Sequence, residues 1–250
     1  MTADLSFDVT AADAETGSTL VVGQSQPGFA GVTAADYLVR HLESTEAGHV
    51  SSADIPAIAP VQDGTPRHHS RLYTLANADI SVLVGELFVP GAAARSYADA
   101  LLAWAEANGI AEVAVLHGVP FQHGPDEHAV FHVATDEYRA NRLPEGVFRP
   151  LPGGFLDGVV GELVTRSLED RAPDVGVYVT PAHPPGPDVD AALMLIDALQ
   201  SVYGVDVDAS ELEELSEQLR SYYAQLANRT ASAAEEEPLS GYGYDDTTYM

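Results

Sequence analysis

A run of six residues, 80–85 with the sequence ISVLVG, constrains the fold of this chain most strongly. It shows no regular alternation of polar and apolar residues and is rich in β-branched side chains, a pattern typical of a strand buried on both faces. Such strands occur in sheets that helices cover on both sides. Shorter apolar runs of the same kind lie at residues 19–23, 113–116, 130–134 and 175–179.

Segments with apolar residues at helical spacing alternate with these runs. They lie at residues 32–42, 92–108, 155–168 and 189–203. Gly109 directly follows the second segment, where a left-handed helix cap is expected. The alternation predicts an α/β fold with a mostly parallel sheet flanked by helices on both faces.

One further helix is predicted near the C-terminus, where Ser210 and Glu213 form a capping box. Apolar residues follow at spacings of three and four, which makes a narrow seam like that of a coiled coil. The seam consists of Leu212, Leu215, Leu219, Tyr222 and Leu226. Two interpretations stay open: the seam packs on the chain's own core, or it forms a contact between subunits.

The composition changes after residue 228. Residues 231–237 are small or acidic, and Pro238 interrupts any helix. We therefore expect a single α/β domain at residues 1–228 and a flexible acidic tail at residues 229–250. The tail holds three tyrosines, and tyrosine offers both apolar area and a hydroxyl group. This end is interpreted as a docking peptide, with a tail that only aids solubility as the alternative.

The charge balance indicates the environment of the chain. It has 38 acidic and 11 basic residues, a net charge of −27, and all the basic residues are arginines. Molar salt relieves the self-repulsion of such a chain, because the Debye length falls to about 3 Å at 1 M. The acidic residues are spread along the chain rather than run together. This pattern predicts a halophilic protein rather than an acidic mimic of a polyanion.

Composition also excludes several functions. Phosphate binding needs clustered cations, so nucleic acid is not an expected partner. Without lysine there is no Walker-type phosphate loop and no Schiff base, and without cysteine there is no thiol nucleophile, disulfide or thiolate metal site. No apolar stretch has the length of a membrane span, and residues 1–13 do not resemble a secretory signal. We expect a cytoplasmic protein with no membrane partner.

Four histidines lie close together in the sequence, at His117, His123, His128 and His132. His128 and His132 would align on a helix, but the segment that follows His128 is predicted as a strand. The spacing therefore predicts no metal site. Glycine turns at residues 28–31 and 153–155 are candidate ligand contacts, although helix packing explains them too. No Gly-x-Ser-x-Gly elbow is present, and we expect neither catalytic residues nor a cofactor.

Three segments resemble the archaeal proteasome assembly chaperone family, the homologues of the eukaryotic proteasome assembly chaperones. They are QPGFAG at residues 26–31 with the helix after it, GGFLDGVVGEL at residues 153–163, and the stretch from 187 to 212. The resemblance covers roughly residues 18–228. It implies a three-layer α/β sandwich related to purine nucleoside phosphorylases, without known enzymatic activity, and a homo-oligomer.

The resemblance also implies a role for the C-terminus. Some archaeal members end in a hydrophobic residue, a tyrosine and any residue, and this tail inserts between α-subunits of the proteasome core particle. Tyr249 and Met250 match the last two positions, whereas Thr248 departs from the first. The expected function is that of an assembly chaperone or core-particle activator. The alternative is an enzyme or small-molecule binder on a phosphorylase-like scaffold, with the glycine turns and His117 lining the site.

Overall fold

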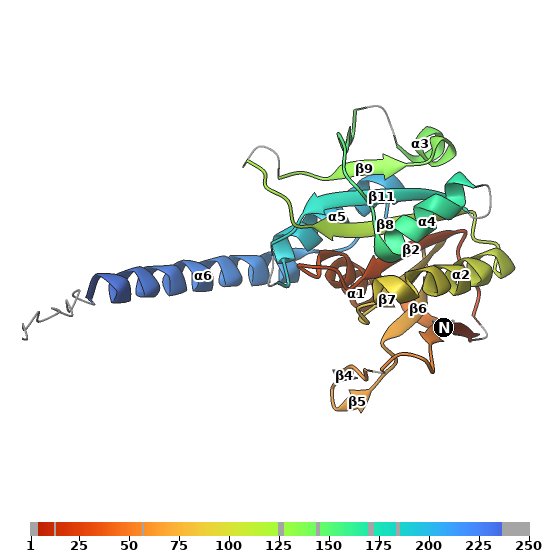
Figure 1. Cartoon of the computed structure of the whole chain (residues 1–250), viewed down its shortest axis with the longest axis horizontal. Coiled ribbons are helices and arrows are strands. Elements are labelled where there is room, and N and C mark those ends of the chain that lie inside the picture. The colour runs from red at the N-terminus through yellow and green to blue at the C-terminus, as the bar shows by residue number, and fades with distance from the viewer. Residues whose placement is uncertain are drawn as a thin grey trace, which may run out of the picture. The chain divides into compact units, whose positions relative to one another are not determined.

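The computed structural model describes residues 5–12, 14–56, 58–124, 128–143, 146–169, 173–183 and 186–236 (Figure 1). The chain divides into two compact units, Met1–Ala209 and Ser210–Met250. The first is an α/β domain, and the described part of the second is one helix, α6 (Ser210–Glu236). The domain boundary expected at residue 228 therefore falls inside α6. None of the helices in the described ranges combines the length and apolar composition needed to cross a bilayer.

Four parallel strands form the centre of the main sheet. In order they are β7 (Ile80–Gly85), β2 (Thr19–Gln24), β8 (Glu112–Val119) and β11 (Asp174–Pro181). Every residue of β7 and β2 is buried. The continuous apolar runs thus became strands covered on both faces, as predicted.

The flanks of the sheet pair in the antiparallel sense, so the sheet as a whole is mixed. On one side, β6 pairs with β7, β3 with β6 and β1 with β3. On the other side, β9 is antiparallel to β11, and β10 is parallel to β9. A separate hairpin joins β4 and β5. These strands are β1 (Asp8–Ala11), β3 (Ser44–Ser51), β4 (Val61–Gln62), β5 (Thr65–Pro66), β6 (Ser70–Leu75), β9 (Phe131–Ala134) and β10 (Arg149–Pro150).

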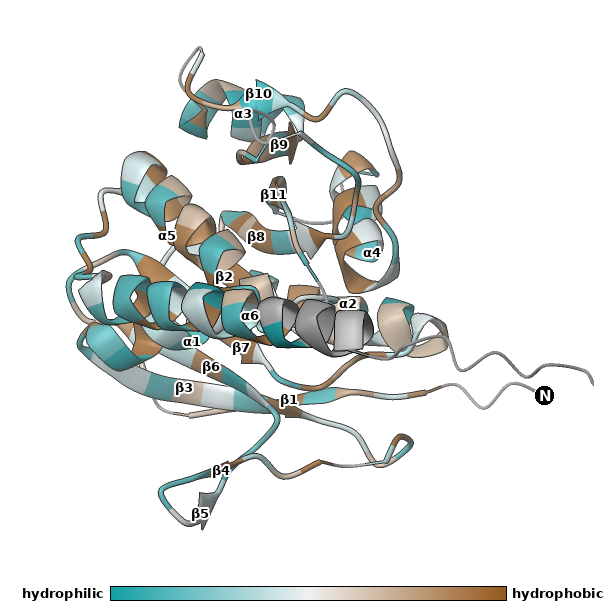
Figure 2. Cartoon of the chain, turned by 90° about the vertical axis from the view of Figure 1, so that its left-hand side faces the viewer, coloured by the Kyte–Doolittle hydropathy of each residue, from teal (hydrophilic) through white to brown (hydrophobic). Residues whose placement is uncertain are grey.

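Helices cover both faces of the sheet (Figure 2). One layer pairs α1 (Ala30–His41) with α5 (Val189–Tyr203), and the other pairs α2 (Gly91–Ala107) with α4 (Gly158–Leu168). A short helix, α3 (Asp136–Arg142), contacts β11. The predicted α/β class and the three-layer arrangement are confirmed.

Helix α1 packs unusually close to the sheet. A Cβ atom at Gly31 would lie 2.1 Å from the carbonyl oxygen of Leu116 on β8. Only glycine permits this approach of helix backbone to strand backbone. The turn before α1 is equally restricted, because Gly28 has a φ of 84° and Phe29 a φ of 53°. The local sequence therefore fixes how the chain leaves β2 and enters α1.

Candidate functional site

The expected docking residues Thr248, Tyr249 and Met250 lie outside the described part of the chain, which ends at Glu236. The seam predicted on the last helix lies on α6. Leu212 is buried, Leu219 is half-buried, and Leu215, Tyr222 and Leu226 are exposed by 42%, 60% and 46%. Both interpretations of the seam therefore stay open.

The strongest candidate site for a ligand is the edge of the sheet where the parallel strands end. β2, β8 and β11 run in the same direction, so the loops that follow them meet at that edge. The first glycine turn lies there: Gly28 accepts a hydrogen bond from the backbone N–H of Asp188, at 2.7 Å. Ligands of open α/β sheets commonly bind outside the carboxyl ends of the strands.

A cavity of about 560 Å³ lies at this edge. Its wall includes Phe121 after β8, Val179 on β11 and the second glycine turn, Gly153 and Gly154. Phe155 beside them is fully exposed, and α4 begins only at Gly158, three residues later than predicted. The wall is mostly apolar, with Arg149 as its one cation, and the guanidinium carbon of Arg149 lies 5.2 Å from the centroid of the Phe131 ring. This composition suits a small, largely apolar ligand.

His117 lies on β8 and is 5% exposed. Burial lowers its pKa to about 4, and the nearby Asp157 carboxylate only partly opposes that shift. Its Nδ1 atom is buried and has no hydrogen-bond partner among the described residues. The ring is therefore neutral at pH 7. A buried neutral imidazole near a strand end can serve packing alone, and it is also a candidate proton acceptor.

Of the other three histidines in this part of the sequence, one stands apart and two meet. His132 lies on β9, where its Nδ1 is 3.1 Å from the carbonyl oxygen of Phe148. His123 and His128 meet, with 3.2 Å between His123 Nε2 and His128 Nδ1. They are joined by His183, which follows β11 and which the sequence did not single out. Only the parallel pairing of β8 and β11 could have indicated its position.

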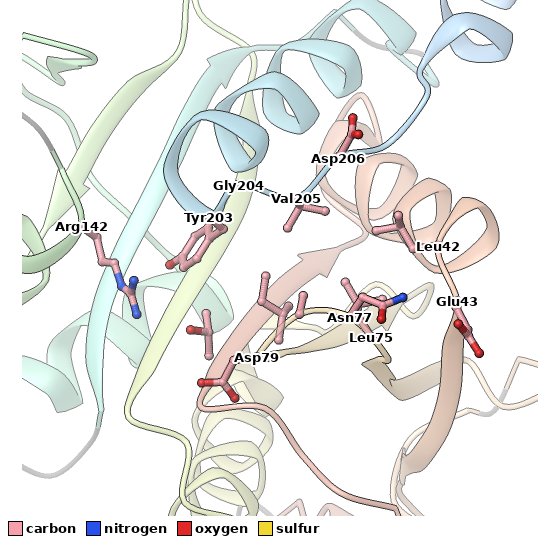
Figure 3. A pocket seen from close by; sticks show the side chains of 13 residues that line it. Leu42, Glu43, Leu75, Asn77, Asp79, Arg142, Tyr203, Gly204, Val205 and Asp206 are labelled. Carbon is pink, nitrogen blue, oxygen red and sulfur yellow. The ribbon is translucent and has the colours of Figure 1, made fainter.

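A second cavity, of about 610 Å³, opens at the opposite end of the strands (Figure 3). Several polar groups around it already have protein partners. Arg142 Nε donates to Glu112 Oε2 at 2.8 Å, Thr19 Oγ1 donates to Glu112 Oε1 at 2.8 Å, and the Arg142 guanidinium lies 5.4 Å from the ring centroid of Tyr203. Two Ser18 donors hold the Asp79 carboxylate and lower its pKa. The Arg142 contacts tie strand ends to α3 and α5, and the paired groups have little capacity left for a ligand.

The structure thus defines a three-layer α/β scaffold followed by a long helix with exposed apolar residues. The model of the PAC2 family matches residues 20–227, and the chain belongs to the PAC2 family. No match was found among curated proteins.

Solved structures show the same fold. PbaA of Pyrococcus furiosus, described as an archaeal homolog of proteasome-assembly chaperone, is 20% identical, with a TM-score of 0.78 over 92% of this chain and 95% of that one. PbaB of the same organism, described as an archaeal proteasome activator, is 16% identical, with a TM-score of 0.74 over 89% and 99%. A PAC2 family protein of Streptomyces avermitilis is 18% identical, with a TM-score of 0.63 over 84% and 95%.

Proposed function

We propose that this chain is a non-enzymatic partner of the proteasome core particle, acting as an assembly chaperone or an activator. The observation that carries the proposal is the likeness over nearly the whole chain to two Pyrococcus furiosus proteins, one described as a chaperone homolog and one as an activator. Membership of the PAC2 family over residues 20–227 supports it. The α-ring subunits of the core particle are the proposed partners, and a halophilic cytoplasm is the proposed setting.

Docking is proposed to occur through the last three residues, Thr248, Tyr249 and Met250. A tyrosine ring supplies a rigid anchor, and the terminal carboxylate pairs with a cation or with backbone donors of the partner. Thr248 stands where the motif has a hydrophobic residue and supplies only a methyl group. Thr248→Leu is therefore expected to tighten binding.

A homo-oligomer joined through α6 is the second part of the proposal. Leu215, Tyr222 and Leu226 lie on one side of the helix at spacings of seven and four, and all three are exposed. A second copy of α6 would cover them as in a coiled coil. An oligomer would also present several tails at once, which raises avidity without any new contact.

The docking test compares the full chain with a variant that lacks Tyr249 and Met250, in a pull-down of α-subunits in molar salt. Tyr244→Ala is the matched control, because it removes a tail tyrosine outside the motif. The proposal expects the deletion to abolish capture and the control to retain it. Equal capture by the full chain and the deletion variant would rule out the tail mechanism.

The oligomer test measures mass by light scattering. Leu215→Glu with Leu226→Glu is expected to shift the chain to monomer, because it places charges in the seam. Glu214→Gln on the same helix is the control. An unchanged mass in the double variant would exclude α6 as the subunit contact.

A small-molecule binder is the second candidate function, favoured by the cavity of about 560 Å³ at the carboxyl ends of the strands. Ligands that bind the native state raise its melting temperature. A thermal-shift screen with nucleosides, phosphate and common metabolites tests this function. If none of these compounds raises the melting temperature in molar salt, the small-molecule function is contradicted and only the proteasome role remains.

A further inference from the structure

Three histidines from two loops converge at the carboxyl edge of the sheet. His123 and His128 belong to the segment between β8 and β9, and His183 follows β11. One nitrogen of each ring lies within 4.8 Å of the corresponding nitrogens of the other two. The ring centroids are 5.0 Å, 5.2 Å and 5.4 Å apart.

The outer nitrogens of two rings are already held by acceptors. His123 Nδ1 lies 3.0 Å from the carbonyl oxygen of Phe121, and His183 Nδ1 lies 2.7 Å from Asp188 Oδ2. A carbonyl or carboxylate oxygen only accepts, so each Nδ1 carries a proton and each neutral ring turns the lone pair of Nε2 inward. Metal-binding histidines have this arrangement, in which the outer N–H is given to a carbonyl or a carboxylate.

Asp188 is itself fixed from several sides. Its carboxylate accepts hydrogen bonds from the backbone N–H of Ala191 at 3.0 Å and of His183 at 2.7 Å. Its own N–H donates to Gly28. The carboxylate that anchors His183 Nδ1 is therefore part of the cap of α5 and of the glycine turn.

The inner nitrogens lie at the separation that a metal needs. Zinc–nitrogen bonds of about 2.0–2.1 Å in a tetrahedron place neighbouring ligand atoms about 3.3–3.4 Å apart. His123 Nε2 and His128 Nδ1 are 3.2 Å apart. Small rotations of His183, whose side chain is 58% exposed, would bring the third nitrogen from within 4.8 Å to that range.

His128 adds an independent observation. Its Nε2 atom is buried and has no hydrogen-bond partner among the described residues. With His123 Nε2 as the acceptor, His128 Nδ1–H donates to it, so a metal ion bound here would replace the proton that the two rings share. Imidazole binds a metal in its neutral form.

We propose that His123, His128 and His183 form a binding site for a divalent cation of the zinc class, with Asp188 as the residue that positions His183. Three imidazole ligands suit Zn²⁺, Co²⁺ or Ni²⁺ better than Mg²⁺ or Ca²⁺, which prefer oxygen ligands. The exposed side of His183 gives the ion a path from solvent and leaves a fourth position for water or an incoming ligand. The proposal does not depend on the proteasome role.

Titration of the metal-free full chain with Zn²⁺ and with Co²⁺ tests the site. Calorimetry gives the stoichiometry, and the visible absorption of Co²⁺ reports a tetrahedral nitrogen environment. Molar salt suppresses general attraction of cations to this acidic chain. We expect one ion per chain, and loss of the Co²⁺ spectrum in His123→Gln and in His183→Gln. Asp188→Asn is expected to weaken affinity by about 10- to 100-fold while keeping the stoichiometry.

His132→Gln is the matched control, because His132 lies on β9 outside the cluster, and it should bind as the unmodified chain does. His183→Gln keeps the test valid if His123→Gln unfolds, since the His183 side chain is exposed. Two results would overturn the proposal. One is the absence of Zn²⁺ binding at micromolar concentrations in the unmodified chain. The other is equal binding by the unmodified chain and by a folded His183→Gln variant.

Discussion

Replacing His117 with phenylalanine is predicted to remove a large part of the pH dependence of stability. The ring is 5% exposed, and burial lowers its pKa from 6.5 to about 4. Phenylalanine keeps an aromatic ring on β8 but cannot take up a proton. It also removes the buried Nδ1 atom that lacks a partner among the described residues.

The size of the effect follows from the two pKa values. Between them the unfolded chain binds more protons at this position than the folded chain does. Stability therefore rises with pH through this window, is fully present above the unfolded pKa of 6.5 and is lost as pH falls toward 4. At about 1.4 kcal/mol per pH unit, the whole window is worth about 3 kcal/mol, of which about 2 kcal/mol is lost between pH 7 and pH 5.

Denaturant unfolding of both proteins at pH 7 and pH 5, in molar salt with a chelator, measures this difference. The free energy of unfolding should fall by about 2 kcal/mol less in His117→Phe than in the unmodified chain. Gly91→Ala, at a position with open space and no titratable group, is the control and should keep the pH dependence of the unmodified chain. Equal pH dependence in His117→Phe and the unmodified chain would refute the reasoning.

Three further substitutions test the packing. Arg71→Met leaves the Glu86 carboxylate without its main partner and should cost about 3–5 kcal/mol of unfolding free energy; a loss below 1 kcal/mol would contradict this. Gly31→Ala should destabilise by about 1–3 kcal/mol in chemical denaturation, whereas Gly91→Ala, which has open space, should not. Tyr138→Phe removes the hydroxyl that contacts two other tyrosine hydroxyls and should lower stability by about 1 kcal/mol, measured by urea unfolding.

The centre of the fold was predictable because its strands are apolar throughout and its helix ends carry local signals. Strand β7 has the predicted limits, and α5 runs from Val189 to Tyr203 as expected, with Gly204 in the left-handed conformation after it. The left-handed Gly109 after α2 is also confirmed. These features depend on neighbouring residues only, which is why the sequence reveals them.

The flanking strands were missed for a physical reason. Strand β3 has the sequence STEAGHVS, with exposed and buried positions mixed and a register shift between Glu46 and Gly48. Its pairing partners, rather than its composition, make it a strand. The end of the last helix was also misjudged: residues up to Glu236 are small or acidic but good helix formers, and α6 extends through them.

The histidine cluster was even harder to predict from the sequence than the flanking strands, because the order of the strands brings its residues together. The spacing of His128 and His132 predicted no metal site, and His183, which joins the cluster, lies 55 residues beyond His128 in the sequence. The parallel register of β8 and β11, which pairs Val119 with Pro181, brings the loops together. No local pattern encodes such a meeting, so it becomes visible only once the strand order is known.

The central claim is that this chain binds the proteasome core particle. The most direct measurement is retention of the untagged full chain on immobilised core-particle α-subunits in molar salt, which screens nonspecific attraction between charged surfaces. The account predicts that the chain is retained and is released by an excess of a peptide with the sequence of its last residues. Passage of the folded chain through the column without retention would contradict the account.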